Sequence, residues 1–224
     1  MNRMVRPAAL TLEQPAQERA APEPVPRVPL PELREEARHC RRCDLYKHAT
    51  QTVFGEGRAG ARLVFVGEQP GDREDIAGRP FVGPAGALFD RALEDAGIAR
   101  KDAYITNAVK HFKFEERGKR RLHKRPNAGE IKACKWWLDR ELATIRPDVV
   151  VALGATAAQA LVGRAVPVLR ARGPADFHGQ AGFITVHPSM LLRIPEPERK
   201  ADEYRKFIAD LRRVRKMMEK IEAA

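Results

Sequence analysis

One histidine stands inside a cationic run of the chain, KRRLHKRP, which spans residues 119–126. A basic run attracts phosphate and needs no histidine to do so. His123 is therefore either an incidental neighbour of the cations or a side chain with a chemical role. A neutral imidazole can act as a nucleophile, and the surrounding cations favour the neutral form because like charges oppose protonation.

The cysteines form a second group that could do chemistry. Cys40 and Cys43 make a CxxC pattern within RHCRRCDLYKH, and Cys134 lies far away in the sequence. Their odd number argues against a disulfide framework, and no expected strand precedes the pattern as a thioredoxin-like motif would require. The pattern favours zinc or an iron–sulfur cluster with a histidine as fourth ligand, and free buried thiols are the alternative. The candidate histidines are His39, His48 and His111.

Short apolar segments alternate with amphipathic ones along most of the chain. The expected strands, short and rich in β-branched residues, are 62–67, 103–107, 148–154 and 183–187. The expected helices, whose apolar residues recur at three and four positions, are 84–98, 127–145, 155–163 and 198–224. This alternation predicts an α/β fold in which helices cover both faces of a parallel sheet.

Ligands of such folds bind beyond the carboxyl ends of the strands. The first expected strand is followed by GEQPGDREDIAGRPFVGPAG, a loop rich in glycine and proline whose backbone could approach a ligand closely. It lacks the Gly-Lys-Ser/Thr of a phosphate-binding P-loop. Asn107 and His187 end two other expected strands, and each is either a chemical group or an ordinary turn former or helix cap.

The charge of the chain indicates a polyanionic partner. Its 224 residues include 41 Lys and Arg against 30 Asp and Glu, a net charge of +11. Nucleic acid is the leading partner, and an anionic membrane surface is the weaker alternative. No apolar run approaches the ~20 residues that span a bilayer, and no secretory signal is recognisable, so we expect a cytoplasmic protein with no membrane partner.

The composition divides the chain into two parts. Residues 1–31 are rich in proline and alanine and show little apolar periodicity, which predicts a disordered leader. Residues 32–224 are expected to form a single domain. Nothing in the sequence demands a partner chain, so a monomer is expected.

Together these segments resemble the iron–sulfur uracil-DNA glycosylases. GEQPG, PFVGPAG, TNAVKHFK, the CxxC with its distant cysteine, VALGATA and HPSMLLR occur in the order seen in that family, over roughly residues 32 to 215. With KRRLH inserted, the chain closely resembles the UdgX group of the superfamily. The resemblance implies a three-layer α/β/α sandwich around a mostly parallel four-stranded sheet. It also implies an enzyme that flips uracil out of single- or double-stranded DNA and cuts its N-glycosidic bond.

The resemblance implies a uracil pocket. Phe81 should stack on the uracil ring, Asn107 should read its amide-like edge, and His187 should stabilise charge on the departing base. Backbone groups of the GEQPG loop, with Gly67 and Gln69, should complete the pocket.

The resemblance makes His123 a covalent nucleophile. His123 matches the UdgX histidine that attacks C1′ after uracil leaves, which gives a stable histidine–sugar bond. Glu68 and Gln69 should orient or polarise His123; the broader iron–sulfur family usually has a small residue at position 69 and lacks the KRRLH insertion. The alternatives are a turnover glycosylase in which His123 only contacts DNA, and a non-catalytic iron–sulfur module that binds nucleic acid.

The resemblance also implies DNA contacts and a cluster. The cations of the run should hold DNA phosphates, and the HPSMLLR segment should add one more. These residues are Lys119, Arg120, Arg121, Lys124 and Arg193. One [4Fe-4S] cluster, structural rather than catalytic, is expected on four ligands. These ligands are Cys40, Cys43, His111 and Cys134.

Overall fold

The fold is that of a computed structural model, which describes residues 28–223. The leader predicted for residues 1–31 therefore lies outside the described residues up to position 27. The first helix, α1 (Leu30–Arg38), begins just after Pro29, and its buried Leu33 and Ala37 face the core of the domain.

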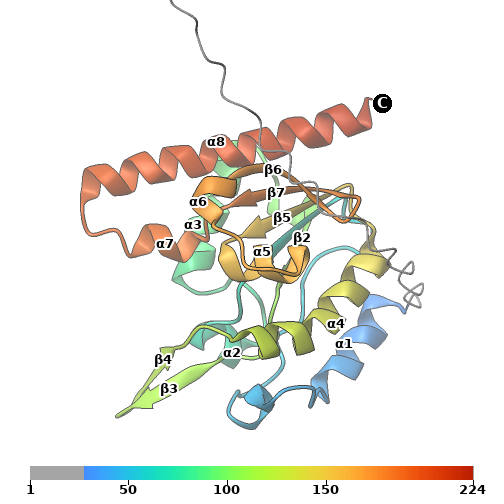
Figure 1. The fold of residues 1–224 in the computed structure, drawn as a ribbon, viewed down its shortest axis with the longest axis vertical. Coiled ribbons are helices and arrows are strands. Elements are labelled where there is room, and N and C mark those ends of the chain that lie inside the picture. The colour runs from blue at the N-terminus through green and yellow to red at the C-terminus, as the bar shows by residue number, and fades with distance from the viewer. Residues whose placement is uncertain (1–27, 224) are drawn as a thin grey trace, which may run out of the picture.

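A five-stranded sheet forms the centre of the molecule (Figure 1). Its strands lie in the order β2 (Ala103–Asn107), β1 (Leu63–Gly67), β5 (Val149–Leu153), β7 (Gln180–Thr185) and β6 (Gly173–Phe177). The first four run parallel, whereas β6 runs antiparallel to β7. The mostly parallel sheet predicted from the sequence is confirmed.

The fifth strand corrects the prediction of four strands. β6 begins with Gly-Pro and lies at the edge of the sheet, where it pairs only with β7. Proline cannot donate a ladder hydrogen bond and is tolerated at such an edge, so this strand carries almost no β-branched signal. β7 also ends at Thr185, and His187 therefore follows the strand instead of ending it.

Helices cover both faces of the sheet, which confirms the three-layer α/β/α sandwich. One face packs against α1, α4 (Ala128–Ile145) and α5 (Ala155–Val162). The other packs against α3 (Pro84–Ala96), α7 (Pro188–Leu192) and α8 (Pro197–Glu222). Within β1, Val64 and Val66 belong to the first core, and Leu63 and Phe65 belong to the second. A strand buried on both faces explains why the sequence reads as a continuous apolar run.

The short elements complete the chain. They are η1 (Asp44–Lys47), α2 (Asp72–Ala77), η2 (Arg100–Asp102) and α6 (Val168–Ala171). In α8, Phe207, Leu211 and Val214 form a buried stripe at helical spacing on an otherwise charged helix. No helix within residues 28–223 has the length and apolar composition needed to cross a bilayer.

The cationic run forms a β-hairpin. β3 (Phe114–Arg117) pairs with β4 (Arg120–His123) in an antiparallel ribbon that projects from the body of the domain beside α2 (Figure 1). Gly118 adopts φ +60° in the turn between the strands. His123 is the last residue of β4 and lies opposite Phe114, which places it at the base of the hairpin. These two strands are not among those expected from the sequence, because strongly charged exposed strands lack apolar alternation.

Candidate active site

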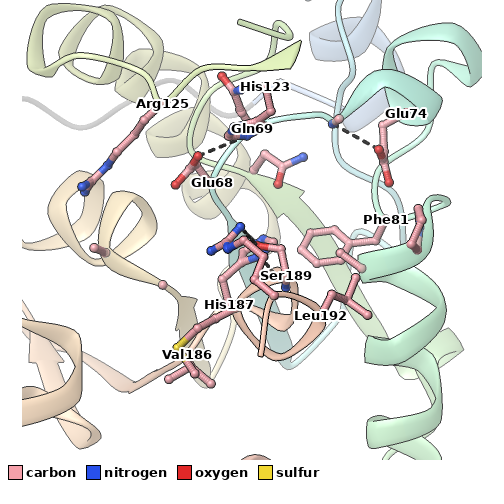
Figure 2. A pocket seen from close by; sticks show the side chains of 18 of the residues that line it. Glu68, Gln69, Glu74, Phe81, His123, Arg125, Val186, His187, Ser189 and Leu192 are labelled. Carbon is pink, nitrogen blue, oxygen red and sulfur yellow. Dashed lines mark hydrogen bonds and ion pairs between the residues drawn. The ribbon is translucent and has the colours of Figure 1, made fainter. Parts of the chain in front are cut away.

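A cavity of about 1000 Å³ lies beyond the carboxyl ends of the parallel strands (Figure 2). The loop after β1, the end of β2, the base of the hairpin, the start of α5 and the α7 segment all contribute to its lining. These segments are far apart in the sequence, and the parallel sheet brings them to one edge. The predicted site residues in the lining are Glu68, Gln69, Phe81, Asn107, His123, His187 and Arg193.

Gly67 allows two predicted uracil contacts to approach each other. It ends β1 opposite Asn107 of β2. A Cβ atom at Gly67 would lie 2.4 Å from Asn107 Oδ1 and 2.6 Å from Phe81 Cζ. The Asn107 side chain is 2% exposed, and its Oδ1 has no hydrogen-bond partner within residues 28–223. An unpaired buried acceptor is costly, and a ligand that donated a hydrogen bond to it would remove that cost.

Phe81 is held at this edge of the sheet because hydrogen bonds fix the conformation of its loop. Its φ is +56°, a left-handed conformation that few non-glycine residues adopt. The Glu74 carboxylate accepts hydrogen bonds from Gly71 N (3.1 Å) and Gly83 N (2.7 Å), one on each side of the loop. The ring of Phe81 lies 5.8 Å from that of His187 between centroids. Strained conformations of this kind persist where surrounding contacts fix them, often at functional sites.

His187 is both a helix cap and a candidate donor, so the two alternatives from the sequence are compatible. Ser189 N donates to Nδ1 of His187 over 3.1 Å at the start of α7. Nδ1 is therefore an acceptor, and the ring hydrogen of the neutral form lies on Nε2. Burial lowers the pKa of His187 to about 4, against the opposing effect of Glu68. The neutral ring can donate an Nε2–H hydrogen bond into the cavity.

His123 and Glu68 form a pair at the mouth of the cavity (Figure 2). Nε2 of His123 lies 3.3 Å from Glu68 Oε1, and the His123 side chain is 48% exposed. Burial raises the pKa of Glu68, but hydrogen bonds from His123 and Thr156 outweigh it, and the net pKa lies below its usual value. Glu68 is therefore a carboxylate that can accept the N–H of the His123 ring.

Gln69 fastens the base of the hairpin. Its Nε2 donates to the backbone carbonyls of Lys113 (3.1 Å) and Lys124 (3.0 Å), and its Oε1 accepts from Lys113 N (3.2 Å). Lys113 precedes β3 and Lys124 follows His123, so one amide spans both ends of the ribbon. The Gln69 amide thus holds the backbone on which His123 lies, while its expected roles in orienting His123 and in contacting uracil stay predictions.

Arg121 differs from the other cations of the run. Its guanidinium donates to Asp72 Oδ1 (2.7 Å) and to Asp75 Oδ2 (2.6 Å). It also lies over the rings of Phe112 and Phe114, 5.4 and 5.0 Å from their centroids. Its charge is balanced within the protein, and it anchors β4 to α2.

The remaining cations fall into two groups. Lys124 pairs with Glu115 across the hairpin at 2.7 Å, and Arg193 donates to Ser189 Oγ at 3.2 Å. Lys119 and Arg120, at the tip, are exposed and make no ion pair within the described part of the chain. These two are the cations best placed to meet phosphates.

The three cysteines approach one another near the end of α1 and the first half of α4. Trp137 Nε1–H donates to Cys40 Sγ over 3.0 Å, and Lys110 N–H donates to Cys134 Sγ over 3.1 Å. Cys40 and Cys43 are close enough to Cys134 to affect its pKa electrostatically. Burial raises the pKa of Cys134 to about 12. N–H donors aimed at sulfur are typical of thiolates that bind iron–sulfur clusters.

His111 has the protonation state that a metal ligand needs. Thr52 Oγ1 donates to Ala37 O (2.9 Å), so it must accept from His111 Nε2 (2.9 Å). The lone pair of the neutral ring then lies on Nδ1, which is buried and has no partner in residues 28–223. Burial lowers the pKa of His111 to about 4. Ligating histidines commonly donate their second N–H in this way.

Cys40 and His111, two of the expected ligands, line one cavity of about 150 Å³. Of the other two candidate histidines, the exposed His39 also lines this cavity and the exposed His48 does not. Across residues 28–223, no group of three or more His, Cys, Asp or Glu side chains could hold a metal ion. A four-iron cluster is a larger body that separates its ligands more widely than one ion does. The orphaned Nδ1 and the N–H donors to sulfur fit such a cluster.

Sequence reasoning missed two residues that line the large cavity, Glu74 and Arg125, and one that is buried next to the lining, Thr156. Glu74 lies three residues after Gly71, at the position of a capping-box glutamate, and that spacing was an available signal. Arg125 belongs to the cationic run but was assigned no role. Thr156, the second residue of α5, gave no signal, because its contacts come from two distant segments.

The fold and the cavity define a class of α/β proteins with a ligand site at the strand ends. The chain belongs to the uracil DNA glycosylase superfamily, whose family model matches residues 54–212.

Individual relatives agree with that membership. The chain is 44% identical over 162 residues to a type-4 uracil-DNA glycosylase of Thermotoga maritima, an alignment that covers 71% of this chain and 81% of the relative. It is 37% identical over 175 residues to a type-4 uracil-DNA glycosylase of Pyrobaculum aerophilum, covering 74% of this chain and 86% of the relative. A type-5 uracil-DNA glycosylase of the latter organism is 32% identical over 176 residues, covering 67% and 71%.

Proposed function

We propose that this protein excises uracil from DNA and then becomes linked covalently through His123 to C1′ of the abasic site. Membership of the uracil DNA glycosylase superfamily and the similarity to two type-4 uracil-DNA glycosylases support the first part. One observation supports the second: His123 lies 3.3 Å from the Glu68 carboxylate at the mouth of the cavity that also contains Asn107 and His187. A histidine that only contacted phosphate would need no carboxylate partner.

Base recognition would use the inner part of the cavity. A uracil must leave the base stack before its glycosidic bond can be reached. The unpaired Oδ1 of Asn107 would accept the N3–H of the flipped base, and Phe81 would stack on its ring. His187 Nε2–H would donate to O2 as the electron pair of the C1′–N1 bond moves onto the base.

The covalent step would follow departure of the base. Glu68 accepts the N–H of one His123 ring nitrogen, which leaves the lone pair on the other nitrogen. That lone pair would form a bond to the electron-poor C1′ of the oxocarbenium-like sugar, while uracil keeps the electrons of the broken bond and takes a proton from solvent. The product is an alkylated imidazolium, and the nearby Glu68 carboxylate would stabilise its positive charge.

A turnover glycosylase is the second candidate. The relatives named above support it, since their names describe glycosylases without covalent trapping. In that case Glu68 would orient a water molecule toward C1′, and His123 would serve only as a DNA contact.

A denaturing gel separates these candidates. Wild type, His123→Ala and the exposed control His48→Ala would each be incubated with a labelled, uracil-containing single-stranded oligonucleotide. A slow band that resists SDS and heat, present for wild type and His48→Ala and absent for His123→Ala, is the expected result. Abasic product without a slow band in all three would make the protein a turnover glycosylase, and intact uracil in all three would exclude both candidates.

We further propose that Cys40, Cys43, His111 and Cys134 hold one [4Fe-4S] cluster. When bound, the cluster would tie the CxxC segment to α4 and to the segment after β2, and it would not exchange electrons in the reaction, because glycosidic cleavage transfers none.

Iron content tests this cluster. Protein purified without oxygen should contain about four irons and absorb visible light. His111→Ala should lose most of the iron and visible absorption, and His48→Ala should keep both. Equal iron in the two variants would remove His111 from the ligand set.

A further inference from the structure

Two side chains connected to Glu68 have no part in the proposed reaction. Thr156 is fully buried near the start of α5, next to Ala155 of the cavity lining, and Arg125 is an exposed lining residue two positions after His123. Thr156 Oγ1 donates to Glu68 Oε2 over 2.7 Å, and Arg125 Nε donates to Thr156 Oγ1 over 3.3 Å. Both therefore connect to the carboxylate that faces His123.

The direction of each hydrogen bond follows from the donor inventory. An arginine has no acceptor, so the Thr156 hydroxyl must accept from Arg125. Its single hydrogen is then free to point only at Glu68 Oε2. This contact fixes the rotation of the carboxylate and leaves Oε1 for the His123 ring.

These contacts form a closed circuit of residues. It runs from His123 to Glu68, to Thr156 and to Arg125, and returns to His123 through the backbone of Lys124. The backbone of Lys124 is itself held, since its carbonyl accepts from Gln69 and its N–H donates to Lys113 O over 2.9 Å. Figure 2 shows Arg125, Glu68 and His123 together on one side of the cavity.

We propose that Thr156 and Arg125 are positioning residues that act through Glu68 to aim the His123 ring at C1′. The inference rests on the proposed trapping reaction. Thr156 supplies the hydrogen bond that orients the carboxylate, and Arg125 keeps the Thr156 hydroxyl from rotating away. Neither residue needs to touch the sugar or the base.

The fraction of excised uracil that ends as covalent complex is the quantity to measure. Thr156→Val keeps the shape of the side chain and loses the hydroxyl, and it should lower this fraction about tenfold, the effect of one hydrogen bond to a charged group. Thr156→Ser keeps the hydroxyl and should restore trapping to within about twofold of wild type. A merely structural role would not produce rescue by serine together with a changed ratio of trapped to released product.

Arg125→Met gives an independent variant, because the residue is exposed and its loss leaves no cavity. It should lower the trapped fraction in the same direction as Thr156→Val, by a smaller factor. An unchanged fraction in folded Thr156→Val and in Arg125→Met overturns the inference.

A second readout separates this inference from the trapping proposal. If wild type releases uracil and forms no covalent product, the trapping proposal fails. The ring ¹⁵N chemical shifts of His123 then report its pairing with Glu68 directly. They should change in Thr156→Val and stay as in wild type in Thr156→Ser, and unchanged shifts in Thr156→Val overturn the positioning role.

Discussion

Arg121 Nη1 lies 2.6 Å from Oδ2 of Asp75, and the Asp75 side chain is fully buried. Loss of the guanidinium would leave this buried carboxylate with the Thr50 N–H as a donor but without a charged partner, at a cost of about 3–5 kcal/mol. We predict that Arg121→Met lowers the free energy of unfolding by an amount of that order in urea titrations. Arg120→Met, its exposed neighbour, should change it by less than about 0.5 kcal/mol.

The same two variants distinguish an anchor from a phosphate contact. Each phosphate contact contributes a slope of about 0.9 to the dependence of log affinity on log salt concentration. Arg120→Met should flatten that slope by about this amount. Arg121→Met should leave the slope unchanged, because its charge is already balanced by Asp72 and Asp75. An equal flattening in both variants would place Arg121 on the DNA backbone in the complex.

Gln69 provides the second prediction. Gln69→Leu removes three hydrogen bonds to the hairpin backbone and should destabilise the protein by about 1–3 kcal/mol, since buried polar groups lose their partners. The amide of Lys113 should exchange its hydrogen faster, and the yield of covalent complex should fall.

Gln159→Leu, on α5, is the matched control for this experiment. The Gln159 side chain makes no hydrogen bond within residues 28–223. If the Lys113 amide exchanges its hydrogen as slowly in Gln69→Leu as in Gln159→Leu, the hairpin keeps its structure without Gln69.

The sequence predicted the elements that are buried on both faces. Val149–Leu153 is such an element, and its apolar run follows directly from that burial. β6 and the two strands of the hairpin were not predicted, because edge strands and exposed strands need no apolar alternation. The site residues at the strand ends could be placed in the same way, since Asn107 follows from the end of β2 and the sheet topology.

The partners of the site residues could not be predicted. The contact between Arg121 and Asp75 joins positions 46 apart, and the contact between Thr156 and Glu68 joins positions 88 apart. Such pairs depend on how α2, α5 and the hairpin meet in three dimensions. A single sequence carries the residue types but not their pairing, so the contact between Arg121 and Asp75 was not predicted and Thr156 was not noticed.

The third prediction concerns the ion pair between Lys110 and Glu141. Both side chains are fully buried and form an ion pair, and Lys110 Nζ also donates to the Asn107 carbonyl over 2.7 Å. Lys110→Met would leave the Glu141 carboxylate unpaired and should cost about 3–5 kcal/mol of unfolding free energy.

The single variants Lys110→Met and Glu141→Gln, together with the double variant, measure the coupling of this pair. The double variant should recover part of the loss, because no unpaired charge remains. Recovery should be incomplete, since Glu141 Oε1 also accepts from Gly55 N and Tyr104 OH. Purely additive losses in urea titrations would mean that the two charges do not interact.

The pKa of His187 provides the fourth prediction. Burial lowers that pKa from 6.5 to about 4, so below about pH 6.5 the unfolded chain binds a proton that the folded protein does not. The contribution of His187 to the free energy of unfolding is therefore complete above pH 6.5 and falls as the pH decreases toward 4. The difference corresponds to about 3 kcal/mol.

His187→Gln removes this titration. The free energy of unfolding of wild type minus that of His187→Gln should decrease by about 3 kcal/mol between pH 7 and pH 4. Because the folded ring stays neutral until about pH 4, uracil release by wild type should also persist down to about pH 5. A loss of uracil release already near pH 6.5 would mean that the working form of His187 is not the neutral Nε2–H donor.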